Sequence, residues 1–186
     1  MNQEKVIEIL ERFYRENPEP KIELNYTNDF TLLVAIVLSA QTTDIKVNEA
    51  TKALFAVADT PEKMLTLGEE KLKEYIKTLG LFNNKAKSVM KLSAELVANF
   101  NSKIPTERPI LESLSGVGRK TANVFLNVAH GQQTIGIDTH ILRIAPRIGL
   151  AVGEKTEIIE EQLLKIIPDK YKNPAHHWLV LHGRYV

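Results

Sequence analysis

Residues 114–122 read Leu114-Ser115-Gly116-Val117-Gly118-Arg119-Lys120-Thr121-Ala122, a two-glycine turn followed by helix-forming residues. Glycines at alternate positions allow positive φ angles and a close approach of the backbone to its neighbours. The backbone N–H groups of residues 117–120 would point outward at a helix N-terminus, where the helix dipole favours an anion. The stretch predicts a corner between two helices whose backbone can hold a phosphate group. An ordinary helix corner with a glycine stop is the alternative for the glycines alone.

Two side chains associated with this turn have reactive groups. Lys120 lies in the first turn of the predicted helix, and Asp138 follows one helix and one loop later. A lysine amine that has lost its proton can attack an electrophilic carbon, and a carboxylate can accept that proton or stabilise positive charge. By spacing alone, Lys120 is more typical of a solvated helix lysine and Asp138 of a helix N-cap than of a catalytic pair.

The net charge of +1 conceals an uneven distribution of charge along the chain. Residues 80–147 contain nine Lys or Arg against four Asp or Glu, whereas residues 1–29 contain four against seven. The basic excess coincides with the two-glycine turn, which favours a surface that binds a polyanion. Uneven solvation of helix surfaces is an equally weighted alternative.

The composition excludes several kinds of site. The chain has no Cys, which excludes disulfides, thiolate metal sites and cysteine-ligated iron–sulfur clusters within these 186 residues. His176 and His177 have no third ligand at a recognisable spacing, so no metal site is predicted. The polar N-terminus does not resemble a signal peptide, and the apolar run Phe30–Ala40 is too short to span a bilayer. We expect a cytoplasmic protein without membrane contact.

Apolar spacing and capping residues predict an all-α fold, because no run of residues alternates long enough to build a sheet. Pro146 should kink or end the helix that contains it. The predicted helices are an N-terminal one ending before Pro18, then Phe30–Ser39, one capped by Thr43 or Asp44, one capped by Thr60, Glu69–Leu79, one opening at Asn83, one starting at Thr106, Arg119–Ala129, Asp138–Ile148, Thr156–Ile167 and Ala175–Arg184.

Five stretches together resemble one known family, in the same order and over essentially the whole chain. They are Leu38-Ser39-Ala40-Gln41-Thr42-Thr43-Asp44, Gly80-Leu81-Phe82-Asn83-Asn84-Lys85-Ala86, the turn at 114–123, Ile137-Asp138-Thr139-His140 and His176-His177-Trp178-Leu179-Val180-Leu181-His182-Gly183-Arg184. On these residues the chain resembles endonuclease III, of the helix-hairpin-helix DNA glycosylase/AP lyase family. The resemblance implies a base-excision repair enzyme, a DNA N-glycosylase and AP lyase that removes oxidised pyrimidines from duplex DNA.

The resemblance also implies roles for individual residues. Lys120 matches the lysine that forms a Schiff base with the sugar, followed by β-elimination, and Asp138 matches the catalytic aspartate. The hairpin residues Gly116, Val117, Gly118 and Arg119 are expected to bind the DNA backbone. Because a base inside a duplex must be flipped out to react, Gln41 and Leu81 are expected to enter the DNA stack and fill the gap.

Further residues have weaker support. His140 is expected near the bound DNA, with a structural role as the alternative. Asn83, Lys85, Lys87 and Lys91 are candidates for a track along the phosphates, against an ordinary solvated helix face. For Gln41 the alternative is a loop-capping residue, and for Leu81 a side chain that packs over a helix end.

The resemblance implies two helical lobes with a DNA cleft between them, one at about 22–133 and the other at 1–21 plus 134–186. Lys120 and Asp138 would face each other across that cleft. The family's 4Fe-4S cluster has no Cys ligands here, so we expect no cofactor for this chain. Either the sequence is a shortened form or the protein dispenses with the cluster.

The expected partner is double-stranded DNA that contains damaged bases or abasic sites. We expect the protein to be a monomer and to act at a bacterial nucleoid. Three alternatives stay open: a non-catalytic helix-hairpin-helix protein, inactive through loss of the cluster segment; a glycosylase without lyase activity, which Lys120 argues against; and a helical scaffold that binds proteins.

Overall fold

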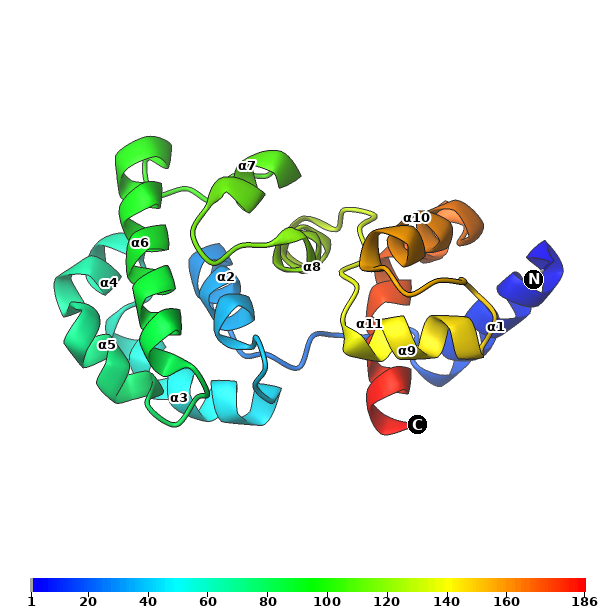
Figure 1. The fold of residues 1–186 in the computed structure, drawn as a ribbon, viewed down its shortest axis with the longest axis horizontal. Coiled ribbons are helices and arrows are strands. Elements are labelled where there is room, and N and C mark those ends of the chain that lie inside the picture. The colour runs from blue at the N-terminus through cyan, green and yellow to red at the C-terminus, as the bar shows by residue number, and fades with distance from the viewer. Residues whose placement is uncertain (1) are drawn as a thin grey trace. The chain divides into compact units, whose positions relative to one another are not determined.

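The structure is a computed structural model in which residues 2–186 are described. These residues form eleven α-helices and no strand, which confirms the all-α prediction (Figure 1). The helices are α1 (Gln3–Glu16), α2 (Asp29–Leu38), α3 (Asp44–Val57), α4 (Pro61–Leu67), α5 (Glu69–Ile76), α6 (Phe82–Phe100), α7 (Arg108–Ser113), α8 (Arg119–His130), α9 (Thr139–Arg147), α10 (Thr156–Ile166) and α11 (Asp169–Tyr185).

The contacts divide the chain into two compact units. We call Glu23–Phe125 the central unit, and the residues up to Ile22 together with Leu126–Val186 the terminal unit. The second boundary falls inside α8, whereas the predicted lobes meet at residue 133. Lys120 belongs to the central unit and Asp138 to the terminal unit.

The core of the central unit is built around α2. Every residue from Phe30 to Leu38 is buried, because this helix is apolar on all sides and α3 and α6 contact it. The long helix α6 also contacts α4 and α5, as Figure 1 shows. Asn28 and Thr31 close a reciprocal capping box that starts α2.

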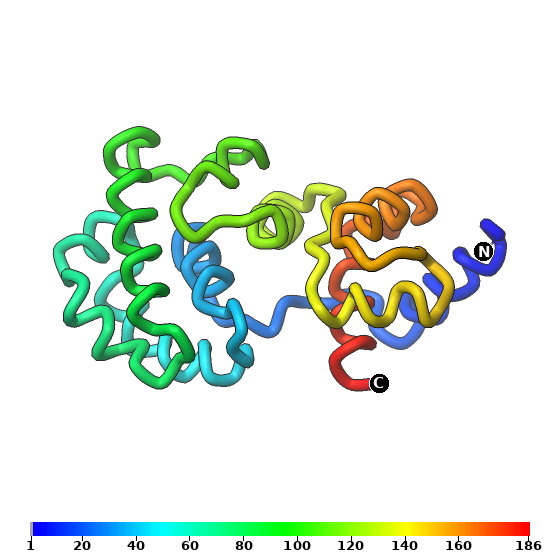
Figure 2. Tube along the Cα trace, viewed as in Figure 1, coloured from blue at the N-terminus to red at the C-terminus, as the bar shows by residue number. Residues whose placement is uncertain are grey.

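The terminal unit joins the two ends of the chain. Helix α1 contacts α11, which in turn contacts α9, and Figure 2 shows the chain returning from its C-terminal half to meet the N-terminal helix. Val6, Leu10 and Trp178 lie in one apolar core with residues of α9 and α10. The Trp178 indole N–H also donates a hydrogen bond to the Asn17 carbonyl oxygen (2.7 Å).

The helix boundaries differ from the predicted ones where proline is involved. Helix α11 begins at Asp169 and not at Ala175, so Pro174 lies inside it. Pro174 lies beyond the first turn, so the helix lacks the i→i−4 hydrogen bond that an N–H at this position would donate to the Lys170 carbonyl oxygen. Helix α9 ends at Arg147, one residue after Pro146, as expected for a helix-terminating proline. None of the helices in residues 2–186 is both long and apolar enough to cross a membrane.

Candidate active site

The predicted corner exists between α7 and α8, and its first glycine is required for two reasons. Gly116 has φ of +77°, a left-handed conformation that disfavours any residue with a Cβ atom. A Cβ at this position would lie 2.9 Å from the Ser88 Cβ atom and 3.3 Å from a Val37 methyl carbon. The turn therefore packs directly against α2 and α6. Gly118 has no such neighbours within 4 Å.

A carboxylate of α6 anchors the same turn. The Ser115 backbone N–H donates a hydrogen bond to Glu95 Oε2 (2.8 Å), and the Ser115 hydroxyl donates one to Glu95 Oε1 (2.9 Å). Charge-assisted pairs of this kind are stronger than neutral hydrogen bonds. Glu95 was not predicted from the sequence, because its partner lies 20 residues away and no local pattern marks the pair.

The N–H groups of the corner are used in different ways. The Val117 N–H donates to the Leu114 carbonyl oxygen (3.1 Å) and closes the turn. Gly118, Arg119 and Lys120 are exposed. Helix α8 presents these residues because Ala122 and Phe125, on its other face, are fully buried. The Val117 N–H group is therefore already used within the turn, and the predicted phosphate contacts narrow to residues 118–120.

Asp138 caps helix α9. Its carboxylate accepts a hydrogen bond from the Ile141 backbone N–H (2.8 Å), and its side chain is half-buried. Ile135 and Ile137, just before it, lie in the core of the terminal unit. They hold in place the loop between α8 and α9 that leads to Asp138. The capping alternative for Asp138 thus holds in the structure, with the bond made to one carboxylate oxygen, Oδ1.

A buried hydrogen-bonded network holds the loop that leads to Asp138. The Asn127 amide N–H₂ donates to the carbonyl oxygens of Thr134 (2.8 Å) and Asn173 (3.1 Å). Its amide oxygen must then accept from His177 Nε2 at 3.1 Å, which places the proton of that ring on Nε2. Burial lowers the pKa of His177 to about 4 and keeps the ring neutral. His177 is therefore a structural residue.

His140 and Gly183 connect α9 to α11. His140 Nδ1 lies 3.2 Å from the Gly183 carbonyl oxygen, which also accepts a hydrogen bond from Arg143. A Cβ at position 183 would lie 2.9 Å from the His140 carbonyl oxygen, so only glycine permits this approach. His140 thus has a structural role in connecting α9 to α11, whereas its contact with DNA stays a prediction.

Gln41 and Leu81 share an unusual backbone conformation. Their φ angles are +55° and +57°, both left-handed, and both side chains are exposed, Leu81 to 59%. Non-glycine residues in this region are uncommon and are worth examining for function. Gln41 follows α2, and Leu81 is the N-cap residue of α6.

Lys85 does not belong to an exposed phosphate track, which corrects the prediction. Only 6% of Lys85 is exposed, and its Nζ donates a hydrogen bond to the Thr42 hydroxyl oxygen (2.7 Å). Burial lowers the pKa of Lys85. Asn83, Lys87 and Lys91 are exposed, as the track requires. Helix periodicity explains the difference, because position 85 faces the core together with Ala86 and Val89.

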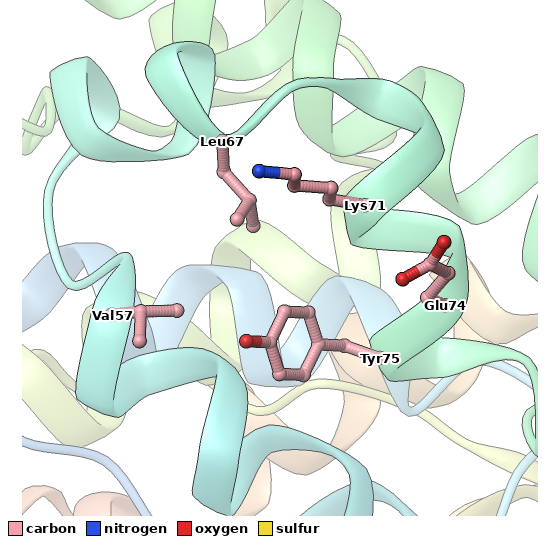
Figure 3. A pocket seen from close by; sticks show the side chains of 5 residues that line it. All are labelled: Val57, Leu67, Lys71, Glu74 and Tyr75. Carbon is pink, nitrogen blue, oxygen red and sulfur yellow. The ribbon is translucent and has the colours of Figure 1, made fainter.

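No group of three or more His, Cys, Asp or Glu side chains that could hold a metal ion occurs within residues 2–186. A cysteine-ligated cluster does not fit a sequence without Cys, and the absence of a cofactor stays a prediction. A pocket of the central unit, formed by α3, α4 and α5, shares none of the predicted site residues (Figure 3). Its lining residues are Val57, Leu67, Lys71, Glu74 and Tyr75.

Comparisons with known proteins agree with the motifs. Residues 34–169 match the HhH-GPD superfamily base excision DNA repair protein family. Endonuclease III of Rickettsia conorii is 58% identical over 181 residues, which cover 97% of this chain and 86% of that protein. Endonuclease III of Escherichia coli strain K12 is 51% identical over 185 residues, which cover 100% and 88% of the two chains.

Solved structures give the same result. A trapped endonuclease III–DNA covalent intermediate, described as an estranged-adenine complex, matches with a TM-score of 0.93 and 38% identity, covering 100% of this chain and 87% of that one. A thermostable thymine-DNA glycosylase matches with a TM-score of 0.84 at 16% identity, covering 98% and 88%, which shows a shared fold only. The chain therefore belongs to the endonuclease III family of base excision DNA repair enzymes, within the HhH-GPD superfamily.

Proposed function

We propose that this chain removes oxidised pyrimidines from duplex DNA and then cleaves the abasic strand, with Lys120 as the nucleophile and Asp138 as its acidic partner. Family membership supports the DNA glycosylase and AP lyase activities. The observation that supports covalent chemistry most directly is the match, over the whole chain, to a relative described as a trapped covalent intermediate with DNA.

The first step replaces the glycosidic bond with a bond to the enzyme. The neutral Lys120 amine attacks C1′ of the sugar, and the C1′–N bond breaks as the base leaves with the bonding electrons. The amine loses a proton as the sugar ring opens to a protonated Schiff base. Asp138 accepts a proton and stabilises positive charge at the sugar.

The second step cleaves the strand. The cationic Schiff base acidifies the C2′–H bond, and loss of that proton expels the 3′ phosphate by β-elimination. Water then releases the cleaved sugar from Lys120. The lyase reaction needs no metal or redox cofactor in this scheme, because every electron pair stays with the sugar, the amine or the leaving group.

The corner between α7 and α8 would hold the DNA backbone. The exposed N–H groups at Gly118, Arg119 and Lys120 lie at a helix N-terminus, where an anion is stabilised, and Gly116 and Val117 shape the turn. Such contacts position the DNA without reading its sequence. Affinity should therefore fall steeply with salt.

Gln41 and Leu81 would occupy the gap that the extruded nucleotide leaves. Both are exposed and held in a defined backbone conformation, so each can enter the stack without first being ordered. A polar group can pair with the orphan base, and an apolar one can unstack its neighbours. His140 would lie close to the same DNA. We also propose that the protein acts as a monomer at the bacterial nucleoid.

Borohydride trapping on an abasic duplex tests the proposal. The unchanged protein should form a covalent adduct, Lys120→Gln should form none, and the exposed control Lys52→Gln should match the unchanged protein. An adduct that persists in Lys120→Gln would remove Lys120 from the mechanism. A folded protein that binds the duplex with full salt dependence and never forms an adduct would instead be a non-catalytic DNA-binding protein.

A further inference from the structure

We propose that Lys85 is a positioning residue that sets the backbone of Gln41 and Leu81 at the same time. Its main chain bonds to Leu81 and its side chain bonds to the loop of Gln41, the two residues proposed to enter the DNA stack. We call this arrangement the strut. The inference rests on the proposed roles of Gln41 and Leu81, and all four residues involved belong to the central unit.

The main-chain contact acts on Leu81. The Lys85 backbone N–H donates a hydrogen bond to the Leu81 carbonyl oxygen (3.0 Å), the first intrahelical bond of α6. Leu81 has a left-handed backbone, and no side-chain hydrogen bond caps this helix. This main-chain bond ties Leu81 to the first turn of α6, and it does not depend on which side chain stands at position 85.

The side-chain contact acts on the loop of Gln41. The Lys85 ammonium donates to the Thr42 hydroxyl oxygen at 2.7 Å, 43 residues away in sequence. The Thr42 backbone N–H donates to the Ser39 carbonyl oxygen (3.1 Å), which closes a turn around Gln41. Thr42 is thus fixed on two sides, and Gln41 is held in its left-handed conformation between the end of α2 and this anchor.

The chemistry of the contact argues for positioning. Only 6% of Lys85 is exposed, burial disfavours its charged form, and no carboxylate within residues 2–186 forms an ion pair with it. A methionine of similar length would fill the same space without that cost. A lysine at this position is explained if the position of the Thr42 hydroxyl matters more than the stability of the core.

The test uses a duplex with 2-aminopurine opposite an uncleavable tetrahydrofuran abasic analogue. The fluorescence of 2-aminopurine rises when that base loses its stacking partners, so it reports the unstacking that the proposed insertion of Gln41 and Leu81 would cause. We expect Lys85→Met and Thr42→Val each to remove most of the rise and to lower the cleavage rate on duplex DNA by about tenfold or more. The double variant should be no worse than Thr42→Val alone, because that change already removes the bond to Lys85 together with the hydroxyl's bond to the Ala40 carbonyl oxygen (3.4 Å).

Single-stranded abasic DNA separates positioning from chemistry, because it has no stack to fill. Schiff-base trapping on that substrate should stay within about twofold of the unchanged protein for Lys85→Met and Thr42→Val. Thr42→Ser keeps the hydroxyl and should restore the fluorescence rise. Lys52→Met and Thr66→Val, exposed changes elsewhere in the central unit, serve as matched controls.

The outcomes are distinct. If Gln41→Ala and Leu81→Ala abolish the rise but Lys85→Met and Thr42→Val keep it, the strut proposal is overturned. If Gln41→Ala and Leu81→Ala also keep the rise, the proposed insertion of these residues fails, and the strut fails with it. Should Lys85→Met not fold, the half-buried Thr42→Val decides alone, because it preserves the shape of the side chain.

Discussion

Asp138 accepts a hydrogen bond from the Ile141 backbone N–H at 2.8 Å, so the carboxylate proposed for catalysis is also the N-cap of helix α9. The two roles use the side chain differently. Capping needs an acceptor oxygen, whereas catalysis needs a negative charge that can accept a proton. Substitutions can therefore separate them.

We expect Asp138→Asn to keep the free energy of unfolding within about 0.5 kcal/mol, because Asn caps helices as well as Asp does. Asp138→Ala should lower the free energy of unfolding by about 1 kcal/mol, because alanine cannot accept the capping hydrogen bond. Both should lose most borohydride trapping. Urea denaturation and trapping on the same preparations measure the two effects. Equal loss of stability in both variants would contradict the assigned capping role.

Gly116→Ala should destabilise the protein by about 2 to 4 kcal/mol, because it combines a left-handed backbone with a contact of 2.9 Å to Ser88 Cβ. Gly118→Ala should cost less than about 1 kcal/mol, because no atom lies within 4 Å of its added methyl group. Thermal denaturation of the two variants compares the positions directly. A similar loss at both would show that the close packing of Gly116 is not what requires a glycine.

Glu95→Ala should weaken the hairpin by leaving the Ser115 N–H without its acceptor, at a cost of about 1 to 3 kcal/mol. The affinity for abasic duplex should fall as well, because the turn is no longer held against α6. Glu49→Ala, an exposed change on α3, is the control. Denaturation and fluorescence anisotropy measure the two quantities, and unchanged values in Glu95→Ala would contradict the anchoring role.

Acid should destabilise the terminal unit through His177. The folded pKa of about 4 lies below the ordinary 6.5, so between these values the unfolded chain binds a proton that the folded chain does not. His177 therefore does not reduce the free energy of unfolding at neutral pH. As the pH falls from 6.5 to 4, its titration lowers the free energy of unfolding by up to about 3 kcal/mol.

Urea denaturation across that pH range measures the effect. His177→Gln should flatten the dependence in this window, because a glutamine amide can donate to Asn127 but does not titrate. A variant whose stability falls as steeply as that of the unchanged protein would place the titrating group elsewhere.

Local signals predicted most of the helices and their starts. Thr43, Thr60 and Asp138 each accept a hydrogen bond from the residue three positions later, so the whole interaction lies within one short stretch of sequence. The two-glycine corner was predictable for the same reason. The family followed from five such stretches in the right order.

Interactions between distant segments were not predictable in this way. Lys85 looked like a surface lysine beside Lys87 and Lys91, and only the packing of α6 shows that it is buried against Thr42. Glu95 carries no local mark of its bond to Ser115. Each pair lies tens of residues apart, where periodicity and capping give no information.

By itself the sequence determined the all-α class, the helix caps, the glycine corner and the family, because these depend on residues within a few positions of one another. Only the tertiary structure decided which polar groups are buried together, including Asn127 with His177 and Lys85 with Thr42. The physical reason is that burial and long-range hydrogen bonding depend on how helices pack, and a side chain's surroundings are set by segments far from it along the chain.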